Sequence, residues 1–234
     1  MVLLVLGQLG AALVVLLLAP PVSAPSAALA LLCATAPALV AARTLRPRAP
    51  GEVTDADLLT LLRHLAAGAL ATSAVLAVDG ALAARSWPLA LLLGAALATD
   101  LLDGPVARRT GTAGPVGARI DMEADAVLVL VVSVLAALVV GPWALAIGLM
   151  RYAYVAASWI RPALRRPLGF SQARRVIGGA QGLALLTAVV PAVPATVSTG
   201  IVATALGLLV VSFGRDVIAL ERAERRAQGT RRPD

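Results

Sequence analysis

The sequence has one cysteine, one histidine, no lysine and few aromatic residues, and only 14% of its 234 residues are charged. The single cysteine, Cys33, excludes an intramolecular disulfide and a cysteine metal site. Soluble domains have about 25% charged residues, so the low charge argues against a disordered chain and against a soluble globular enzyme. The lone His64 has no partner in the sequence, and we interpret it as a structural or interfacial residue.

The residues that are abundant are apolar, since 59% of the chain is hydrophobic and the mean hydropathy is +0.89. This composition is typical of a polytopic helical membrane protein. The net charge of +7 comes from 20 cations, all of them arginine, against 13 acids. Because cations of membrane proteins gather in cytoplasmic loops, we expect no nucleic-acid partner.

Crossing a bilayer core takes about 20 apolar residues, or somewhat fewer at the short end, and the sequence contains eight candidate spans. They are about Val2–Leu18, Ala27–Ala42, Leu58–Val78, Trp87–Leu102, Ala124–Val140, Trp143–Ile160, Val176–Val190 and Ala195–Phe213. Arginines cluster after the second, fourth, sixth and eighth spans, and Arg85 is the one cation in the other loops between spans. The positive-inside rule therefore predicts an all-α transmembrane bundle with both termini in the cytoplasm.

Polar segments divide the chain into four predicted parts. Residues 1–43 hold two N-terminal spans, 44–57 form a cytoplasmic linker, and 58–214 form the main membrane domain. Residues 215–234 form a basic cytoplasmic tail that continues a helix before fraying. Residues 1–24 have an alternative interpretation as a cleaved signal peptide, but they lack the positive n-region that such peptides carry.

Five of the 13 acids flank the loop between the fourth and fifth spans. They are Asp100, Asp103, Asp121, Glu123 and Asp125. The i,i+3 spacing of Asp100 and Asp103 and the i,i+4 spacing of Asp121 and Asp125 put each pair on one helix face. Gly117, one turn before Asp121, lets the two helices approach closely. Glu123 points away from its neighbours, so four carboxylates are predicted to face one another.

Carboxylates this close together repel unless a positive charge neutralises them. Hard divalent cations with oxygen ligands do this, and two such ions commonly serve displacement at phosphorus. Arg108, between the two pairs, is placed to hold a phosphate oxygen. The alternative is that the acids are only solvated and pair with Arg108, Arg109 and Arg119.

Residues 100–125 read DLLDGPVARRTGTAGPVGARIDMEAD. This segment resembles the signature of the CDP-alcohol phosphotransferase family, also called CDP-alcohol phosphatidyltransferases, D-x2-D-G-x2-A-R-x8-G-x3-D-x3-D. All eight fixed positions match: Asp100, Asp103, Gly104, Ala107, Arg108, Gly117, Asp121 and Asp125. The resemblance covers about residues 55–214 and implies a six-helix family core, with the first two spans as additions.

The resemblance implies an enzyme of phospholipid biosynthesis in a bacterial inner membrane, with its active site facing the cytoplasm. Such enzymes transfer a phosphatidyl or other phosphoalcohol group from a CDP-linked donor, usually CDP-diacylglycerol, to a hydroxyl acceptor and release CMP. The resemblance also implies a homodimer.

The resemblance assigns roles to the motif residues. Two ions of Mg²⁺ or Mn²⁺ would be held by four aspartates: Asp100, Asp103, Asp121 and Asp125. Asp125 would also act as general base on the acceptor hydroxyl. Gly104, Ala107 and Arg108 would line the cytidine diphosphate site, and Gly117 is counted with them as a substrate-binding residue.

Weaker signals concern the substrates. Thr60 and Arg63 match a Thr and an Arg that many family members carry in this span, although Asp57 stands where Asn is usual. These two residues are either substrate-binding or simply capping and interfacial. Arg151 lies within a span, where a charge needs a partner, and we expect it to face the cavity and bind substrate. Gly114 stands where users of inositol phosphate tend to have Ser or Thr, which weakens the case for an inositol-phosphate acceptor without excluding it.

Two other classes of protein compete with this interpretation. An intramembrane prenyltransferase also uses Mg²⁺ and aspartate motifs, but its two motifs lie far apart in sequence. A non-catalytic transporter or assembly protein would use buried acids as an ion path, and it would not need the Gly-x2-Ala-Arg element between the two aspartate pairs.

Overall fold

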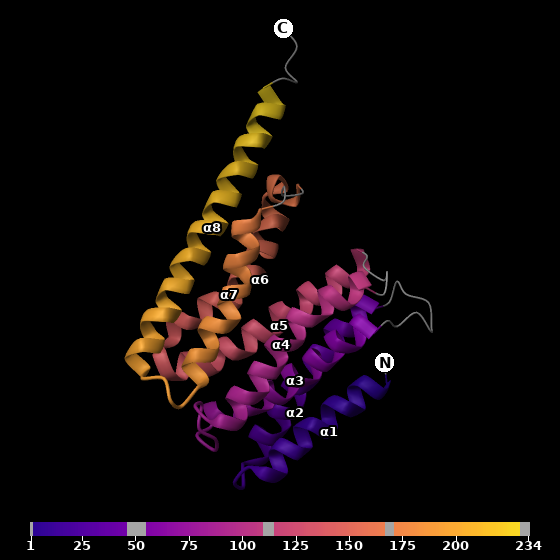
Figure 1. Cartoon of the computed structure of the whole chain (residues 1–234), viewed down its shortest axis with the longest axis vertical. Coiled ribbons are helices and arrows are strands. Elements are labelled where there is room, and N and C mark those ends of the chain that lie inside the picture. The colour runs from indigo at the N-terminus through magenta and orange to yellow at the C-terminus, as the bar shows by residue number, and fades with distance from the viewer. Residues whose placement is uncertain (1, 46–54, 110–114, 167–170, 230–234) are drawn as a thin grey trace.

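The structure, a computed structural model, describes residues 2–45, 55–109, 115–166 and 171–229, and within these ranges it contains helices and no strand (Figure 1). The α-helices are α1 Val2–Leu18, α2 Ala24–Leu45, α3 Asp55–Val78, α4 Trp87–Arg109, α5 Pro115–Val140, α6 Leu145–Ile160, α7 Gln172–Val189 and α8 Ala195–Gly229. Short 3₁₀ turns at Pro142–Ala144 and Pro162–Arg165 flank α6. The all-α prediction is confirmed.

Several helices extend beyond the apolar segments that the sequence marked. Helix α4 continues past Leu102, α5 begins well before Ala124, and α8 continues past Phe213. The prediction located the apolar segments only. Helical structure continues past them, and in α8 the continuation is rich in arginine and alanine, which are good helix formers. The predicted helical continuation of the C-terminal tail is confirmed as far as Gly229.

Five helical segments of the described chain are long and apolar enough to cross a membrane. They are Ala24–Arg43, Leu58–Val78, Gly117–Val140, Pro142–Ile160 and Ala195–Arg226. Shorter apolar segments occur in α1, at Leu4–Leu18, and in α4, at Trp87–Asp100. The protein is therefore an integral membrane protein. The count of eight spans and the cytoplasmic placement of both termini remain predictions.

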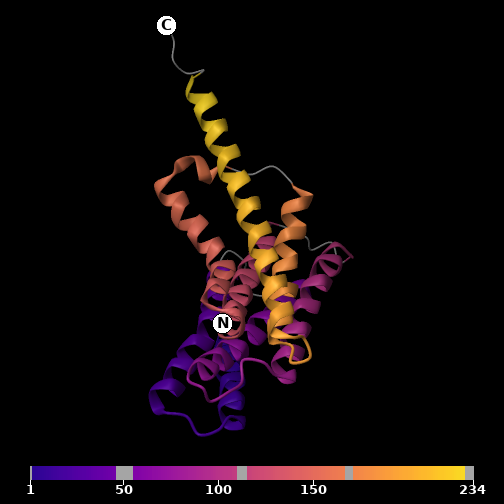
Figure 2. The ribbon, with the colours of Figure 1, turned by 90° about the vertical axis from the view of Figure 1, so that its left-hand side faces the viewer.

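Helix α3 is the centre of the bundle. It packs against α1, α2, α4 and α5, and α5 in turn contacts α6, α7 and α8. Figures 1 and 2 show α1 to α5 side by side as one group, with α6, α7 and α8 leaning away from it. The core where these groups meet is aliphatic and includes Leu70, Leu93, Leu128, Leu135 and Leu185. The bundle thus brings the first turns of α3 and α5 close to the last turns of α4.

Glycines allow the tight connection between α5 and α6. Gly141 ends α5 with a φ of 114°, a backbone conformation that L side chains rarely adopt. On the first turn of α6, a Cβ at Gly148 would lie 2.6 Å from the Cα of Leu130 and would also overlap the Ser133 hydroxyl. The two helices therefore approach closely because residue 148 has no side chain.

Replacing Gly148 should consequently destabilise the bundle. We expect Gly148→Ala to lower the free energy of unfolding by about 1–3 kcal/mol, because the backbone of Leu130 must move to admit the methyl group. Gly207→Ala is the matched control, since nothing lies within 4 Å of a Cβ at that helical glycine. Thermal unfolding of both variants in the same detergent measures the difference. Equal stabilities would contradict the close α5–α6 contact.

At the far end of the bundle, Arg85 connects two loops. Its Nη2 donates to the carbonyl oxygen of Val190, at 2.9 Å, and to that of Val193. Val190 caps the C-terminus of α7, where unpaired carbonyls favour a cation. This contact gives a local reason for the one arginine that departs from the predicted distribution.

Candidate active site

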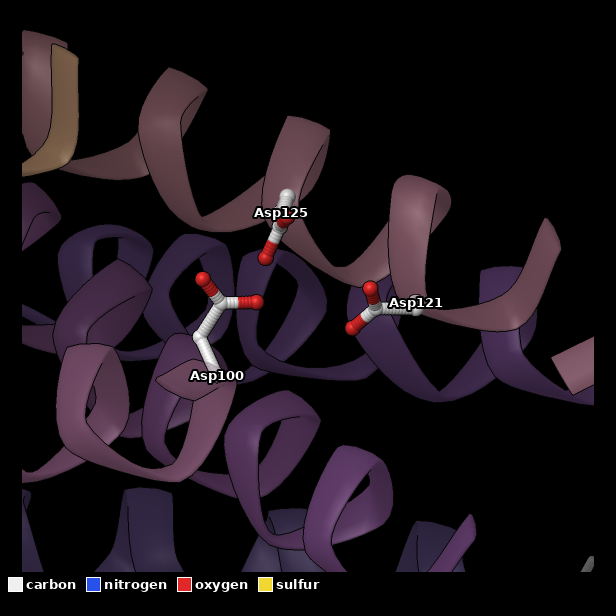
Figure 3. A group of neighbouring side chains, drawn as sticks. All are labelled: Asp100, Asp121 and Asp125. Carbon is white, nitrogen blue, oxygen red and sulfur yellow. The ribbon is translucent and has the colours of Figure 1, made fainter. Parts of the chain in front are cut away.

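Three of the predicted metal-binding aspartates lie together. Asp100 comes from α4, whereas Asp121 and Asp125 come from successive turns of α5, and the three carboxylates point toward one another (Figure 3). Each offers an oxygen, and these oxygens all lie within 4.8 Å of one another. Asp103 belongs to the same helix as Asp100, but its side chain lies outside the described part of the structure. Carboxylates from the two helices are therefore observed to meet for three of the four predicted aspartates.

A buried arginine from a third helix closes the cluster. The Nη1 atom of Arg63, on α3, lies 2.6 Å from an oxygen of Asp121, 2.6 Å from one of Asp125 and 3.1 Å from one of Asp100. One guanidinium nitrogen thus contacts three carboxylates. From sequence alone Arg63 is either a substrate-binding or an interfacial residue, and its pairing with the aspartates is a finding of the structure. The sequence signal for this pairing is that an arginine within an apolar helix needs a buried counter-charge.

The cluster is closed on one side and open on the other. The side chain of Arg63 is 0% exposed, whereas those of Asp100, Asp121 and Asp125 are 31%, 36% and 43% exposed. The carboxylates therefore receive a buried positive charge from α3 and present their remaining oxygens to the outside. A ligand can reach them from the open side.

The residues present fit a hard divalent cation. Mg²⁺ takes oxygen ligands at 2.0–2.1 Å, so ligands across one ion lie about 4.2 Å apart. The aspartate oxygens, all within 4.8 Å, are close to that separation. The contacts of all three carboxylates with one Arg63 nitrogen also show that the cluster accommodates positive charge at its centre.

The residues next to Arg63 on the first turns of α3 are also buried. Thr60, one turn earlier, is buried, and its backbone carbonyl lies 2.9 Å from Nδ1 of the buried His64 ring. Thr60 and Arg63, the two residues of the weaker resemblance, are thus both buried at this end of α3. Their predicted contact with substrate remains a prediction.

Arg151 pairs with an acid of the neighbouring helix, as a charge within a span requires. Its Nη2 lies 2.5 Å from an oxygen of Glu123, and both side chains are half-buried. Glu123 was predicted to point away from the aspartates, and it does not belong to the group of three. The pair joins α5 to α6. Substrate binding by Arg151 therefore has no contact with the aspartate cluster to support it and stays a prediction.

A double-mutant cycle separates the two roles of Arg151. We expect Arg151→Leu and Glu123→Gln to be coupled by roughly 0.5–3 kcal/mol in the free energy of unfolding, because they share one contact. Thermal unfolding of the two single variants and of the double variant measures this coupling. Independent losses of stability would contradict the pairing. A loss of enzymatic activity in Arg151→Leu alone would support its substrate role.

The structure describes the remaining motif residues only in part. Gly117 lies on α5, one turn before Asp121, and is half-buried. Gly104, Ala107 and Arg108 belong to the last turns of α4, and the structure describes only the backbone of these three residues. Gly114 also falls outside the described residues.

The comparisons with known proteins identify the family. Residues 53–215 match the CDP-alcohol phosphatidyltransferase family, and this match covers well over half of the chain and includes all three clustered aspartates. Comparison with curated proteins and with solved structures finds no match. The match favours a phosphotransferase over a prenyltransferase or a transporter, and it leaves α1 and α2 outside the family segment. The chain belongs to the CDP-alcohol phosphatidyltransferase family, an enzyme family that transfers a phosphoalcohol group from a CDP-alcohol.

Proposed function

We propose that this enzyme transfers a phosphatidyl group from CDP-diacylglycerol to the hydroxyl group of a small polar acceptor and releases CMP. The observation that carries the proposal is the cluster of Asp100, Asp121 and Asp125, whose carboxylates meet within the segment that matches the family. An apolar, lipid-embedded chain supports a lipid-linked donor, because the donor then reaches the site laterally through the membrane.

The proposed reaction is a displacement at phosphorus. The acceptor oxygen forms a bond to the phosphorus that carries the diacylglycerol, and the bond from that phosphorus to the CMP phosphate oxygen breaks. The acceptor proton passes to Asp125, whose carboxylate is the most exposed of the three and lies at the open side of the cluster. CMP leaves with the electron pair of the broken bond.

Divalent ions belong to this proposal. Asp100, Asp121 and Asp125 would hold Mg²⁺ or Mn²⁺, with Asp103 as the fourth ligand that the resemblance implies and two ions as the proposed number. When bound, these ions supply Lewis-acid stabilisation of the charge on the diphosphate. Arg63 holds the same carboxylates from the buried side and keeps them together.

The position of the site supports a reaction at the cytoplasmic face of a bacterial inner membrane. The cluster lies where α3 and α5 begin, and α4 ends nine residues beyond Asp100. Arginines concentrate after α2, α4 and α6, on the side where cations of membrane proteins gather. We also propose a homodimer, which light scattering of the purified protein in detergent would measure.

The acceptor is proposed to carry negative charge. Several arginines between the end of α6 and the first turn of α7 are already paired with acids of α8: Arg161 with Glu221, Arg166 with Glu224 and Arg174 with Asp216. Arg175, exposed in the first turn of α7, forms none of these pairs and is the proposed contact for a phosphorylated acceptor.

An acceptor panel tests the proposed function. Purified protein receives CDP-diacylglycerol and Mg²⁺ with glycerol 3-phosphate, inositol phosphate, inositol, serine or no acceptor, and CMP and the lipid product are quantified. We expect CMP and a new phospholipid in equal amounts with a phosphorylated acceptor, and neither in the blank. If no acceptor in the panel supports CMP release, the proposed class of donor or of acceptor is contradicted.

A further inference from the structure

Helix α1 lies outside the family segment and carries a fully buried polar side chain. Gln8 is 0% exposed, and its Nε2 donates a hydrogen bond of 2.7 Å to the backbone carbonyl of His64 on α3. An amide group buried among apolar side chains is unfavourable unless it is hydrogen-bonded, and here Nε2 is bonded whereas Oε1 has no hydrogen-bond partner among the described residues. In membrane helices such an amide holds neighbouring helices together. The contact therefore fixes α1 to one particular turn of α3.

The niche for this amide depends on a glycine. In an α-helix the carbonyl of residue 64 also accepts from the backbone N–H of residue 68, so the side chain at position 68 stands beside that carbonyl. Residue 68 is glycine, and a Cβ there would lie 2.7 Å from Cδ of Gln8 and 3.0 Å from the backbone oxygen of Ala34 on α2. Helices α1, α2 and α3 thus meet around Gln8, in space left by Gly68.

The turn of α3 that Gln8 contacts is the turn that carries Arg63. His64 follows Arg63 directly, and its ring contacts the carbonyl of Thr60. Arg63 in turn contacts Asp100, Asp121 and Asp125. A hydrogen bond to the carbonyl of residue 64 restrains both the rotation of α3 about its axis and its depth in the bundle. The same restraint therefore acts on the guanidinium of the neighbouring residue.

We propose that Gln8 is a positioning residue for the active site, and that α1 holds the Arg63 turn of α3 in register with the three aspartates. This assignment rests on the proposed function for its kinetic consequence. The structural part, a restraint on residues 60–68 of α3, is independent of the reaction. A first helix that only anchored the chain in lipid would not need a buried amide on the face that meets α3.

The test compares Gln8→Met with Leu13→Met. The first variant removes the hydrogen bond at similar side-chain volume, and the second places the same residue at an exposed position of the same helix. We expect kcat for CMP release to fall roughly 10-fold in Gln8→Met with the KM for the donor unchanged, as for residues that orient metal-binding groups. We also expect faster amide hydrogen exchange confined to residues 60–68, and a melting temperature close to that of the control.

A second pair of variants tests the niche itself. Gly68→Ala should reproduce the loss of kcat, and Gln8→Ala combined with Gly68→Ala should lose no more than Gln8→Ala alone, because both changes break one contact. Additive losses would overturn the proposal. A Gln8→Met variant with wild-type kcat and wild-type amide exchange would also overturn it. A fall in kcat that accompanies faster amide exchange throughout the chain would do the same. Wild-type protein without CMP release would contradict the proposed function, and the exchange measurement would then decide on Gln8 alone.

Discussion

Asp125→Asn should abolish nearly all CMP release while the protein remains folded. The substitution keeps the size of the side chain but removes the charge and the base, and the loss of a general base lowers the rate roughly 10²–10⁴-fold. Asp125 also shares Arg63 with two other carboxylates, so the remaining pairs keep the helices together. Initial rates of CMP release with CDP-diacylglycerol, Mg²⁺ and the preferred acceptor measure the effect.

The control for this variant is Asp79→Asn. Asp79 is exposed just after the C-terminus of α3, at the opposite end of the helix from Arg63. The same chemical change at this position should leave the rate of CMP release within about twofold of the wild-type rate, because surface substitutions away from buried or catalytic groups have small effects. A rate for Asp125→Asn equal to that of Asp79→Asn would exclude Asp125 as the base.

Arg63→Met should destabilise the protein strongly when divalent ions are absent, and Mg²⁺ should restore much of the loss. Loss of a hydrogen-bonded charged partner costs about 1–3 kcal/mol, and here it leaves three partly exposed carboxylates without their buried counter-charge. A divalent ion bound by the same carboxylates would replace that charge. Thermal unfolding in EDTA and at increasing Mg²⁺ concentration measures both effects.

The dependence on Mg²⁺ distinguishes this explanation from simple loss of packing. Leu70→Ala, which removes a buried side chain of α3 at a distance from the charges, should destabilise by about 2–5 kcal/mol. Mg²⁺ should stabilise that variant no more than it stabilises the wild type. If Mg²⁺ stabilises Arg63→Met and Leu70→Ala equally, then Mg²⁺ does not supply the positive charge that the aspartates lose with Arg63.

The aspartates were predictable from sequence because helical spacing carries the information. Asp121 and Asp125 are four residues apart, and Asp100 lies near the end of the preceding apolar segment. Helical spacing and the order of the two spans therefore place the carboxylates at the same end of two consecutive helices. The structure brings the three described carboxylates together as expected.

The buried partners were not predictable in the same way. Arg63 is far from the aspartates in sequence, and its position depends on how α3 packs between α4 and α5. Gln8 is one polar residue in an apolar helix, and only tertiary contact shows that it faces His64 and the space left by Gly68. Helix packing determines such long-range contacts, which intrinsic helix propensity and spacing do not specify.

The most direct test of the account is the divalent dependence of CMP release from CDP-diacylglycerol by the purified protein. The account predicts no CMP in EDTA, and acceptor-dependent CMP release when Mg²⁺ or Mn²⁺ is restored, with saturation at the concentration that protects Arg63→Met from thermal unfolding. CMP release at the same rate in EDTA would contradict a role for the aspartates Asp100, Asp121 and Asp125 as metal ligands in the reaction.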